Sequence, residues 1–308
     1  MIVVLAGGVG AARFLQGLTR LLDSERLVIV ANTGDDLEVY GLHVSPDLDT
    51  LVYTLAGIVD EEKGWGLKGD TFNFLEMMGE YGQETWFRIG DRDLTTHVLR
   101  TSLLRRNLSL TEVTRELCRH LKIQHEILPM TDDPVRTVMH TDEGVLDFQE
   151  YFVKRRFEVE VKNVVFIGSE SARPNPDVLE AITESNGIIL APSNPIVSIG
   201  CILSIQGIRE AIGKSRARKV AISPLISGKP VRGPADRIMR GLGIEPSALG
   251  IASIYKGLIN TLVIDKEDSH FEDAVQKLGM EIIVTETRMD TLEAKIKLAE
   301  LVLRALRR

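Results

Sequence analysis

The chain has 308 residues, with 37 Lys and Arg against 44 Asp and Glu, so its formal net charge is −7. This length suits one large domain, with or without an insertion, and the acidic balance argues against nucleic acid or an anionic membrane as a partner. Only Cys118 and Cys201 are present, far apart and outside any C-x-x-C pair. A disulfide framework and a thiolate zinc site are therefore not expected.

The N-terminal sequence MIVVLAGG has no basic segment ahead of a long apolar stretch. We expect no signal peptide, and no apolar run approaches the roughly 18 residues of a membrane-spanning helix. The expected location is the cytoplasm.

Residues 2–6 form a short apolar run that ends in glycines, which is typical of a parallel strand buried on both faces. Residues 11–22 place apolar side chains on one helical face, and residues 27–31 predict a second strand. Together these segments predict a right-handed βαβ unit.

Residues 59–154 differ in composition, with Trp65, Trp86 and amphipathic stretches at 70–81 and 110–121. We expect an inserted, mainly helical cap there. An insertion between strands of a nucleotide-binding sheet lies over the strand ends, where it can add a second substrate pocket and exclude water.

The alternation of strands and helices resumes near residue 155 and continues to a long terminal helix from Thr291. This pattern predicts a Rossmann-like, doubly wound, mostly parallel α/β sheet built from residues 1–58 and 155–308. The predicted strands of this part are 164–167, 188–191, 220–223, 262–264 and 282–284.

Gly7, Gly8 and Gly10 follow the first predicted strand and open a helix. Glycines there let backbone N–H groups approach phosphate oxygens. Arg13 stands where a dinucleotide fingerprint needs its third glycine, which weakens a dinucleotide interpretation. The alternative is a tight turn without a ligand.

Asn32 opens the segment NTGDD after the second strand, where open α/β sheets bind ligands. A polar loop with an Asx turn is the alternative. Asp47 and Asp49 in SPDLDT are two carboxylates one residue apart at a predicted helix start. Such a pair suits Mg²⁺ or substrate, although one of them could serve only as a helix cap.

Arg88, Asp91 and Thr95 belong to a dense run of charges that ends at His97. A guanidinium group and hydroxyls can hold a polar ligand, but a solvated loop of salt bridges is the alternative. His97 is more readily interpreted as a packed histidine than as a base.

Ser193, Asn194, Pro195 and Ser198 follow the strand at 188–191 and offer hydroxyls, an amide and N–H groups to a nucleotide or phosphate. A later loop, 223–234, carries Lys229 and Arg232, which could contact a diphosphate. The sequence contains no H-E-x-x-H, G-x-S-x-G or protein-kinase set, which leaves phosphate chemistry or nucleotide binding.

Taken together, these segments resemble the 2-phospho-L-lactate transferases of coenzyme F-420 biosynthesis, a family that includes bacterial phosphoenolpyruvyl transferases. The resemblance covers nearly the whole chain in order. It is carried by GGVGAARFL (7–15), NTGDD (32–36), SPDLDT (45–50), GDRDLTTH (90–97), LPMTDDPV (128–135) and APSNPIVSIG (191–200).

The resemblance implies transfer of a phospholactyl or phosphoenolpyruvyl group from a guanylyl diphosphate ester to the deazaflavin Fo (7,8-didemethyl-8-hydroxy-5-deazariboflavin). The products would be F-420-0, or its dehydro form, and GMP. It further implies Mg²⁺ dependence, a homodimer, deazaflavin binding by Asp49 and Arg88, and a guanine nucleotide site at the glycine loop and residues 193–198. The sequence does not decide between the two donors.

On this basis we expect Asp49, with Asp47, to hold Mg²⁺, and Asp49 also to orient the attacking hydroxyl. Asp91 and Thr95 are expected beside Arg88 in the deazaflavin site. Trp65, Trp86 or Phe72 could stack on the deazaflavin, or could form the core of the cap. The main alternative function is a non-catalytic, nucleotide-sugar-binding regulator of related fold.

Overall fold

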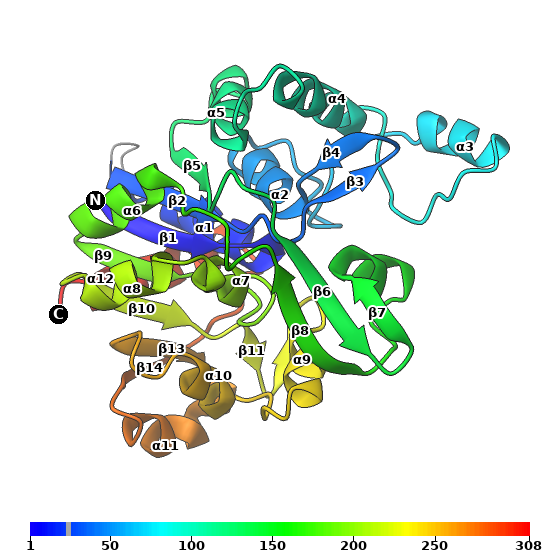
Figure 1. The fold of residues 1–308 in the computed structure, drawn as a ribbon. Coiled ribbons are helices and arrows are strands. Elements are labelled where there is room, and N and C mark those ends of the chain that lie inside the picture. Colours follow the sequence, from blue (N-terminus) through cyan, green and yellow to red (C-terminus); the bar gives the residue numbers. More distant parts are fainter. Residues whose placement is uncertain (23–25) are drawn as a thin grey trace.

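The computed structural model describes residues 1–22 and 26–308. Its centre is a seven-stranded sheet in the order β14-β13-β10-β9-β1-β2-β5, and every pair of neighbours is parallel (Figure 1). The predicted doubly wound α/β fold is confirmed. The strands are β1 (Ile2–Ala6), β2 (Leu27–Ala31), β5 (Glu126–Pro129), β9 (Gly187–Leu190), β10 (Arg218–Ile222), β13 (Thr261–Asp265) and β14 (Glu281–Thr285).

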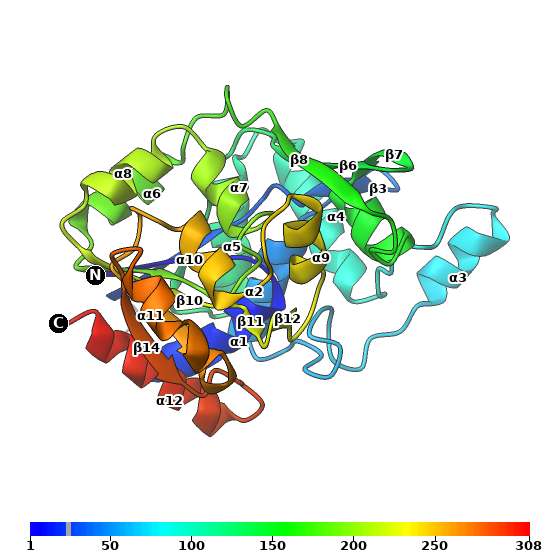
Figure 2. The ribbon, with the colours of Figure 1, turned by 90° about the horizontal axis from the view of Figure 1, so that it is seen from below.

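Both faces of the sheet are buried, as its continuous apolar strands predict. Within β1, Val3 and Leu5 belong to one core, whereas Val4 and Ala6 belong to the other. The first core packs under α6 (Pro176–Glu184), α7 (Ile199–Ser204), α8 (Ile208–Lys214), α10 (Ala248–Ile254) and α11 (Glu272–Gln276). The second packs under α1 (Gly8–Leu18), α2 (Pro46–Leu55), α5 (Leu110–His120) and α12 (Leu292–Ala305), and Figure 2 shows α1 and α12 side by side.

The strand order reverses at β1, because the chain builds β2 and β5 on one side of it and β9, β10, β13 and β14 on the other. In open α/β sheets the crevice for ligands lies at such a switch point, outside the carboxyl ends of the strands. The loops that follow β1 and β9 are therefore placed together at this edge.

One predicted strand lies outside the central sheet. Residues 164–167 belong to β8 (Val161–Ile167), which pairs antiparallel with β6 (Arg136–Thr141) in a separate sheet completed by β7 (Gly144–Asp147). The physical reason is visible in its burial: Lys162 and Asn163 are exposed, whereas every residue of β9 is buried. The expected placement of this strand in the parallel sheet is wrong.

Part of the expected cap, residues 59–154, belongs to the central sheet. The segment contains α3 (Asn73–Glu80), α4 (Asp93–Leu104) and α5, but also β5, which pairs with β2 at one edge of the central sheet. The helical character expected for the segment applies to residues 73–120. Figure 1 shows α3 projecting well away from the sheet.

The short elements that remain are β3 (Leu37–Val39), β4 (Leu42–Val44), β11 (Leu225–Ile226), β12 (Lys229–Pro230), α9 (Ala235–Gly241), the π-helical turn Glu150–Lys154 and the 3-10 helix Lys266–Phe271. Within the described ranges, no helix has the length and apolar character needed to cross a membrane.

Candidate active site

A cavity of about 730 Å³ lies at the carboxyl edge of the sheet. Its volume falls within the range of roughly 300–1,000 Å³ that is usual for small-molecule sites. Its walls come from the loops after β1, β2, β9 and β10, the first turns of α2, the N-terminal half of α4 and the segment 148–157. Residues far apart in the sequence thus form one site.

The loops after β1 and β9 meet at one wall of this cavity. The Gly7 N–H donates to Ser193 Oγ over 3.1 Å. A Cβ on Gly10 would lie 2.1 Å from the Pro192 carbonyl oxygen, so no larger residue fits there. Gly8 has a φ of +67°, which favours glycine. The glycines therefore serve the close approach of two loops as well as an open helix N-terminus.

The predicted nucleotide residues divide into two groups. Gly7, Gly8, Gly10, Ser193, Asn194 and Ser198 line the cavity, whereas Asn32 and Pro195 do not. Asn32 is fully buried and donates to Asp47 Oδ2 over 2.9 Å, while its Oδ1 accepts from the Gly34 N–H. Asn32 therefore orients a cavity residue. The prediction for Pro195 as a contact residue is not supported by its position behind the wall.

Two carboxyl groups, those of Asp35 and Asp47, line the cavity. Burial, and after it the Asp47 charge, raises the pKa of Asp35 well above its ordinary value. Burial likewise raises the pKa of Asp47 to about 6, against the opposing effects of its bonds from Asn32 and the Gly8 N–H. Asp35 Oδ1 is buried without a hydrogen-bond partner among the described residues.

The carboxyl group of Asp49 lies in a different environment. The buried Arg100 donates from Nη1 to Asp49 Oδ2 over 3.1 Å, and its Nη2 pairs with Asp49 Oδ1. A bidentate guanidinium–carboxylate pair is among the strong hydrogen-bonded contacts in proteins. Asp49 still lines the cavity, but a cation already neutralises it.

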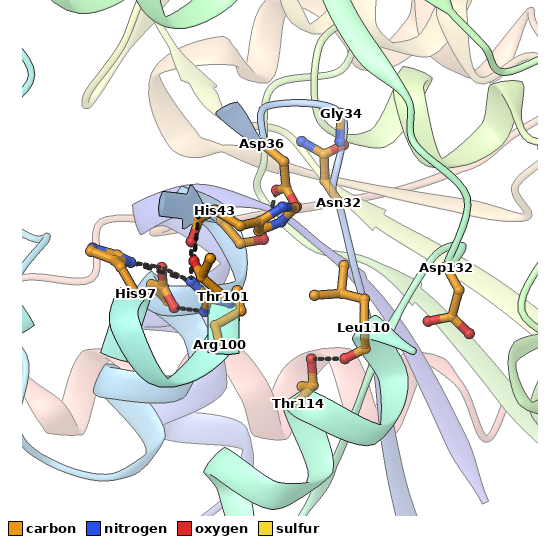
Figure 3. A network of polar contacts seen from close by, with 12 residues as sticks. Asn32, Gly34, Asp36, His43, His97, Arg100, Thr101, Leu110, Thr114 and Asp132 are labelled. Carbon is orange, nitrogen blue, oxygen red and sulfur yellow. Dashed lines mark hydrogen bonds and ion pairs between the residues drawn. The ribbon is translucent and has the colours of Figure 1, made fainter. Parts of the chain in front are cut away.

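Arg100 belongs to a polar face of α4 that also carries Asp93, His97 and Thr101. Their spacing of i, i+4, i+7 and i+8 places all four side chains on one side of the helix. Figure 3 shows His97, Arg100 and Thr101 directed toward the same region as His43. The His43 N–H donates to Thr101 Oγ1 over 2.8 Å, and His43 Nε2 lies 2.9 Å from Asp36 Oδ2.

The start of α4 is fixed by Asp70, which accepts hydrogen bonds from the backbone N–H groups of Arg92 and Asp93. Near it, Arg88 lines the cavity, with its guanidinium carbon 4.2 Å from the centre of the Phe72 ring. Asp91 accepts bonds from Thr71 Oγ1 and from the Asn73 side chain, and these bonds lower its pKa to about 2. Asp91 therefore holds the loop ahead of α3.

Several predicted ligand-binding side chains lie outside the cavity wall: Asp91, Thr95, Trp86, Phe72 and Lys229. Thr95 is exposed on α4, two residues before His97. Arg232 does line the cavity, but its guanidinium group also donates to the carbonyl oxygens of Glu62 and Lys63. Trp65 lines the cavity as predicted.

Sequence reasoning missed part of the wall. The segment 148–157, in which the sequence predicted no binding residue, contributes Phe148, Gln149, Phe152, Val153, Arg156 and Phe157. The rings of Phe148 and Phe152 stack at 5.6 Å, and those of Phe152 and Phe157 at 5.9 Å. The π-helical turn at 150–154 is a signal that only the structure provides, because π turns often occur at functional sites.

Metal ligands are sparse in the site. Among the residues that the structure describes, no three His, Cys, Asp or Glu side chains gather closely enough to hold a metal. Mg²⁺ is usually bound by one or two carboxylates together with water and substrate phosphates, so the Asp35 and Asp47 pair remains compatible with it. Cys118 and Cys201 are buried and free.

Comparison with known proteins agrees with these features. The family model for 2-phospho-L-lactate transferase CofD matches residues 2–302. A phosphoenolpyruvate transferase of Streptomyces griseus is 41% identical over 304 residues, which cover 97% of this chain and 96% of that protein. A 2-phospho-L-lactate transferase of Methanosarcina mazei is 40% identical over 303 residues, covering 98% and 99%.

Among solved structures, a UPF0052 family protein of Bacillus halodurans superposes with a TM-score of 0.69 at 16% identity, covering 98% of each chain. At that identity the likeness shows the fold alone.

Proposed function

The chain belongs to the 2-phospho-L-lactate transferase family, and we propose that it transfers a phospholactyl or phosphoenolpyruvyl group to the deazaflavin Fo. The donor would be the guanylyl diphosphate ester of that group, and the products F-420-0, or its dehydro form, and GMP. One observation carries the proposal beyond family membership. One cavity is lined by three kinds of residue: the loops after β1 and β9, which suit phosphate groups, the carboxyl groups of Asp35 and Asp47, and Arg88 together with aromatic rings.

The loop wall suits the donor diphosphate. Phosphate oxygens need N–H and hydroxyl donors, which Gly10, Ser193 and Ser198 provide beside the N-terminus of α1. Arg13 also lines the cavity, on the first turns of that helix. We place the guanine nucleotide portion of the donor along this wall.

Asp35 and Asp47 fit a magnesium ion better than the expected pair of Asp47 and Asp49. Among the described residues, Asp35 Oδ1 is buried without a hydrogen-bond partner, and no cationic side chain lies within hydrogen-bond distance of the Asp35 or Asp47 carboxyl group. Asp49 is disfavoured as a ligand because Arg100 occupies both of its oxygens. Bound by Asp35 and Asp47, Mg²⁺ would offset charge on the donor's phosphoryl oxygens.

The aromatic part of the cavity lining suits a planar acceptor. Trp65, Phe87 and Arg88 line one part of it and the stacked phenylalanines another, so a tricyclic ring could pack on aromatic faces while its polar edge meets a guanidinium group. Asp49 lines the same cavity from α2. It would orient the acceptor's terminal hydroxyl as a hydrogen-bond acceptor.

In the proposed reaction the terminal ribityl hydroxyl of Fo attacks the phosphorus that bears the lactyl or enolpyruvyl group. A new O–P bond forms, and the P–O bond to the GMP phosphate breaks. The hydroxyl proton leaves to a neighbouring carboxylate or water, and GMP takes the bond's electron pair. The protein contributes mainly positioning and charge complementarity, as in other phosphoryl transfers.

The proposal is tested by incubating the chain with Fo, Mg²⁺ and each guanylyl ester, and measuring GMP and the phosphodiester product by mass spectrometry. We expect product from at least one donor, and its loss in Arg88→Ala. Arg92→Ala is the matched control, because Arg92 is exposed and lies outside the cavity wall. Tight GDP binding without Fo binding or product would favour a non-catalytic nucleotide-binding protein.

A further inference from the structure

Resting on the proposed function, we propose that Arg100 is a positioning residue for the acceptor wall. Its guanidinium group fixes Asp49 as a hydrogen-bond acceptor and His97 as a hydrogen-bond donor, and the two together orient the acceptor's hydroxyl-bearing chain. Arg100 itself is 1% exposed and does not line the cavity.

The first support is the desolvation free energy that burial of the Asp49–Arg100 ion pair costs. Burying an ion pair gains little over an apolar pair of similar size, because desolvation offsets much of the attraction. Asp49 on α2 and Arg100 on α4 are both buried. The pair holds a hydrogen-bond acceptor in a fixed orientation at the cavity wall, which an apolar residue could not supply.

The second support is the tautomer that Arg100 imposes on His97. Arg100 Nη1 lies 3.3 Å from His97 Nδ1. A guanidinium group only donates hydrogen bonds, so Nδ1 must accept and the proton of the neutral ring sits on Nε2. His97 is thereby fixed as a donor at Nε2, which removes it as a general base.

The third support is that this donor has no satisfactory partner. His97 Nε2 is buried and makes no hydrogen bond to any described residue, although Asp93 Oδ2 lies 3.2 Å away in poor geometry. Asp93 instead accepts the Tyr53 hydroxyl proton at Oδ1 over 2.7 Å. Because His97, Asp93, Tyr53 and Asp49 all line the cavity, the free N–H points to a ligand oxygen as its partner.

The test compares Arg100→Met with Arg105→Met, a matched control at an exposed position directly after α4. Among the described residues, the Arg105 guanidinium group donates only to the Gly41 carbonyl oxygen. Binding of Fo is measured by its fluorescence, binding of GDP by calorimetry, and kcat and KM by product formation. We expect Arg100→Met to weaken Fo binding by about 10- to 100-fold and to lower kcat, with GDP binding unchanged. Arg100→Lys should recover part of the Fo binding and part of the kcat, because lysine restores the positive charge but not the bidentate hydrogen bonding of the guanidinium group.

A second variant guards against simple unfolding. Asp49→Leu combined with Arg100→Met removes both charges, so it should regain most of the stability that Arg100→Met loses and still fail to bind Fo. The inference is overturned if Arg100→Met matches Arg105→Met, if it weakens GDP and Fo binding equally, or if the double variant turns over normally. A wild type that binds no Fo would instead refute the proposed function on which the inference rests.

Discussion

Asp47 and Asp49 stand two positions apart on α2, and both line the same cavity, yet their surroundings are opposite. Asp47 faces the glycine loop and Asn32, with no cation bonded to it and a raised pKa. Asp49 faces α4 and is held by the Arg100 guanidinium group. On a helix, residues i and i+2 point in different directions, so neighbours in a motif can serve different chemistry.

The difference assigns two roles. A carboxyl group without a compensating cation, beside a second one in Asp35, is suited to receive a metal ion. A carboxylate already neutralised by a fixed guanidinium group is suited to accept a hydrogen bond in a defined orientation. The predictions below test this division, beginning with the largest expected effect.

Asp47→Asn should lower turnover at saturating Mg²⁺ by roughly 1,000-fold or more, because it removes one of two proposed metal ligands. Rates of product formation measure it. Asp273→Asn is the control, since Asp273 is exposed on α11, away from the cavity. A loss of less than tenfold would remove Asp47 from the metal site.

Arg100→Met should destabilise the fold by about 3–5 kcal/mol, because it leaves the Asp49 carboxylate buried and unpaired. Urea unfolding followed by circular dichroism gives the value. The double change with Asp49→Leu should restore most of the stability. Equal free energies of unfolding for the wild type and Arg100→Met would mean that the Asp49–Arg100 ion pair does not stabilise the fold.

Asp49→Asn should weaken Fo binding by about 10- to 100-fold while leaving the dependence of turnover on Mg²⁺ concentration unchanged. An amide still fits beside Arg100, but it offers one acceptor oxygen in place of two. Fo fluorescence titration and a series of Mg²⁺ concentrations separate these effects. If Asp49→Asn needed a higher Mg²⁺ concentration for turnover, Asp49 would also take part in Mg²⁺ binding, and the proposed difference between Asp47 and Asp49 would be wrong.

The pH dependence of stability gives the smallest effect. The pKa of Asp47 is raised from 3.8 to about 6 in the folded state, so the fold loses stability as pH rises through this interval. In the absence of Mg²⁺, Asp47→Asn should gain stability over the wild type between pH 4 and pH 7, by on the order of 1–3 kcal/mol. Unfolding at several pH values measures the slope, and a flat difference would contradict the raised pKa.

The sequence predicted the fold well because the central strands are continuous apolar runs that end in glycine or polar loops. Strands β1 and β9 illustrate this, since both are almost entirely buried and each leads into a loop at the cavity. Strand β8 was misplaced because its apolar half resembles a parallel strand, while its partner strand β6 lies in a segment without a comparable signal.

The site was predicted only in part. Motifs that join a strand to a helix located the glycine loop and residues 193–198. Arg100 was missed because its significance depends on Asp49, which lies 51 positions away in the sequence. The polar spacing of Asp93, His97, Arg100 and Thr101 along one face of α4 was a readable signal. The segment 148–157 carried no such signal, because its phenylalanines cannot be distinguished from ordinary core residues in the sequence.

The proposed roles require that Mg²⁺ bind to Asp47 and not to Asp49. Calorimetric titration of Mg²⁺ into the GDP complex of the wild type, Asp47→Asn and Asp49→Asn tests this requirement most directly. We expect Asp47→Asn to lose Mg²⁺ binding and Asp49→Asn to bind Mg²⁺ with the affinity of the wild type. Loss of Mg²⁺ binding in Asp49→Asn with binding retained in Asp47→Asn would contradict the proposed roles.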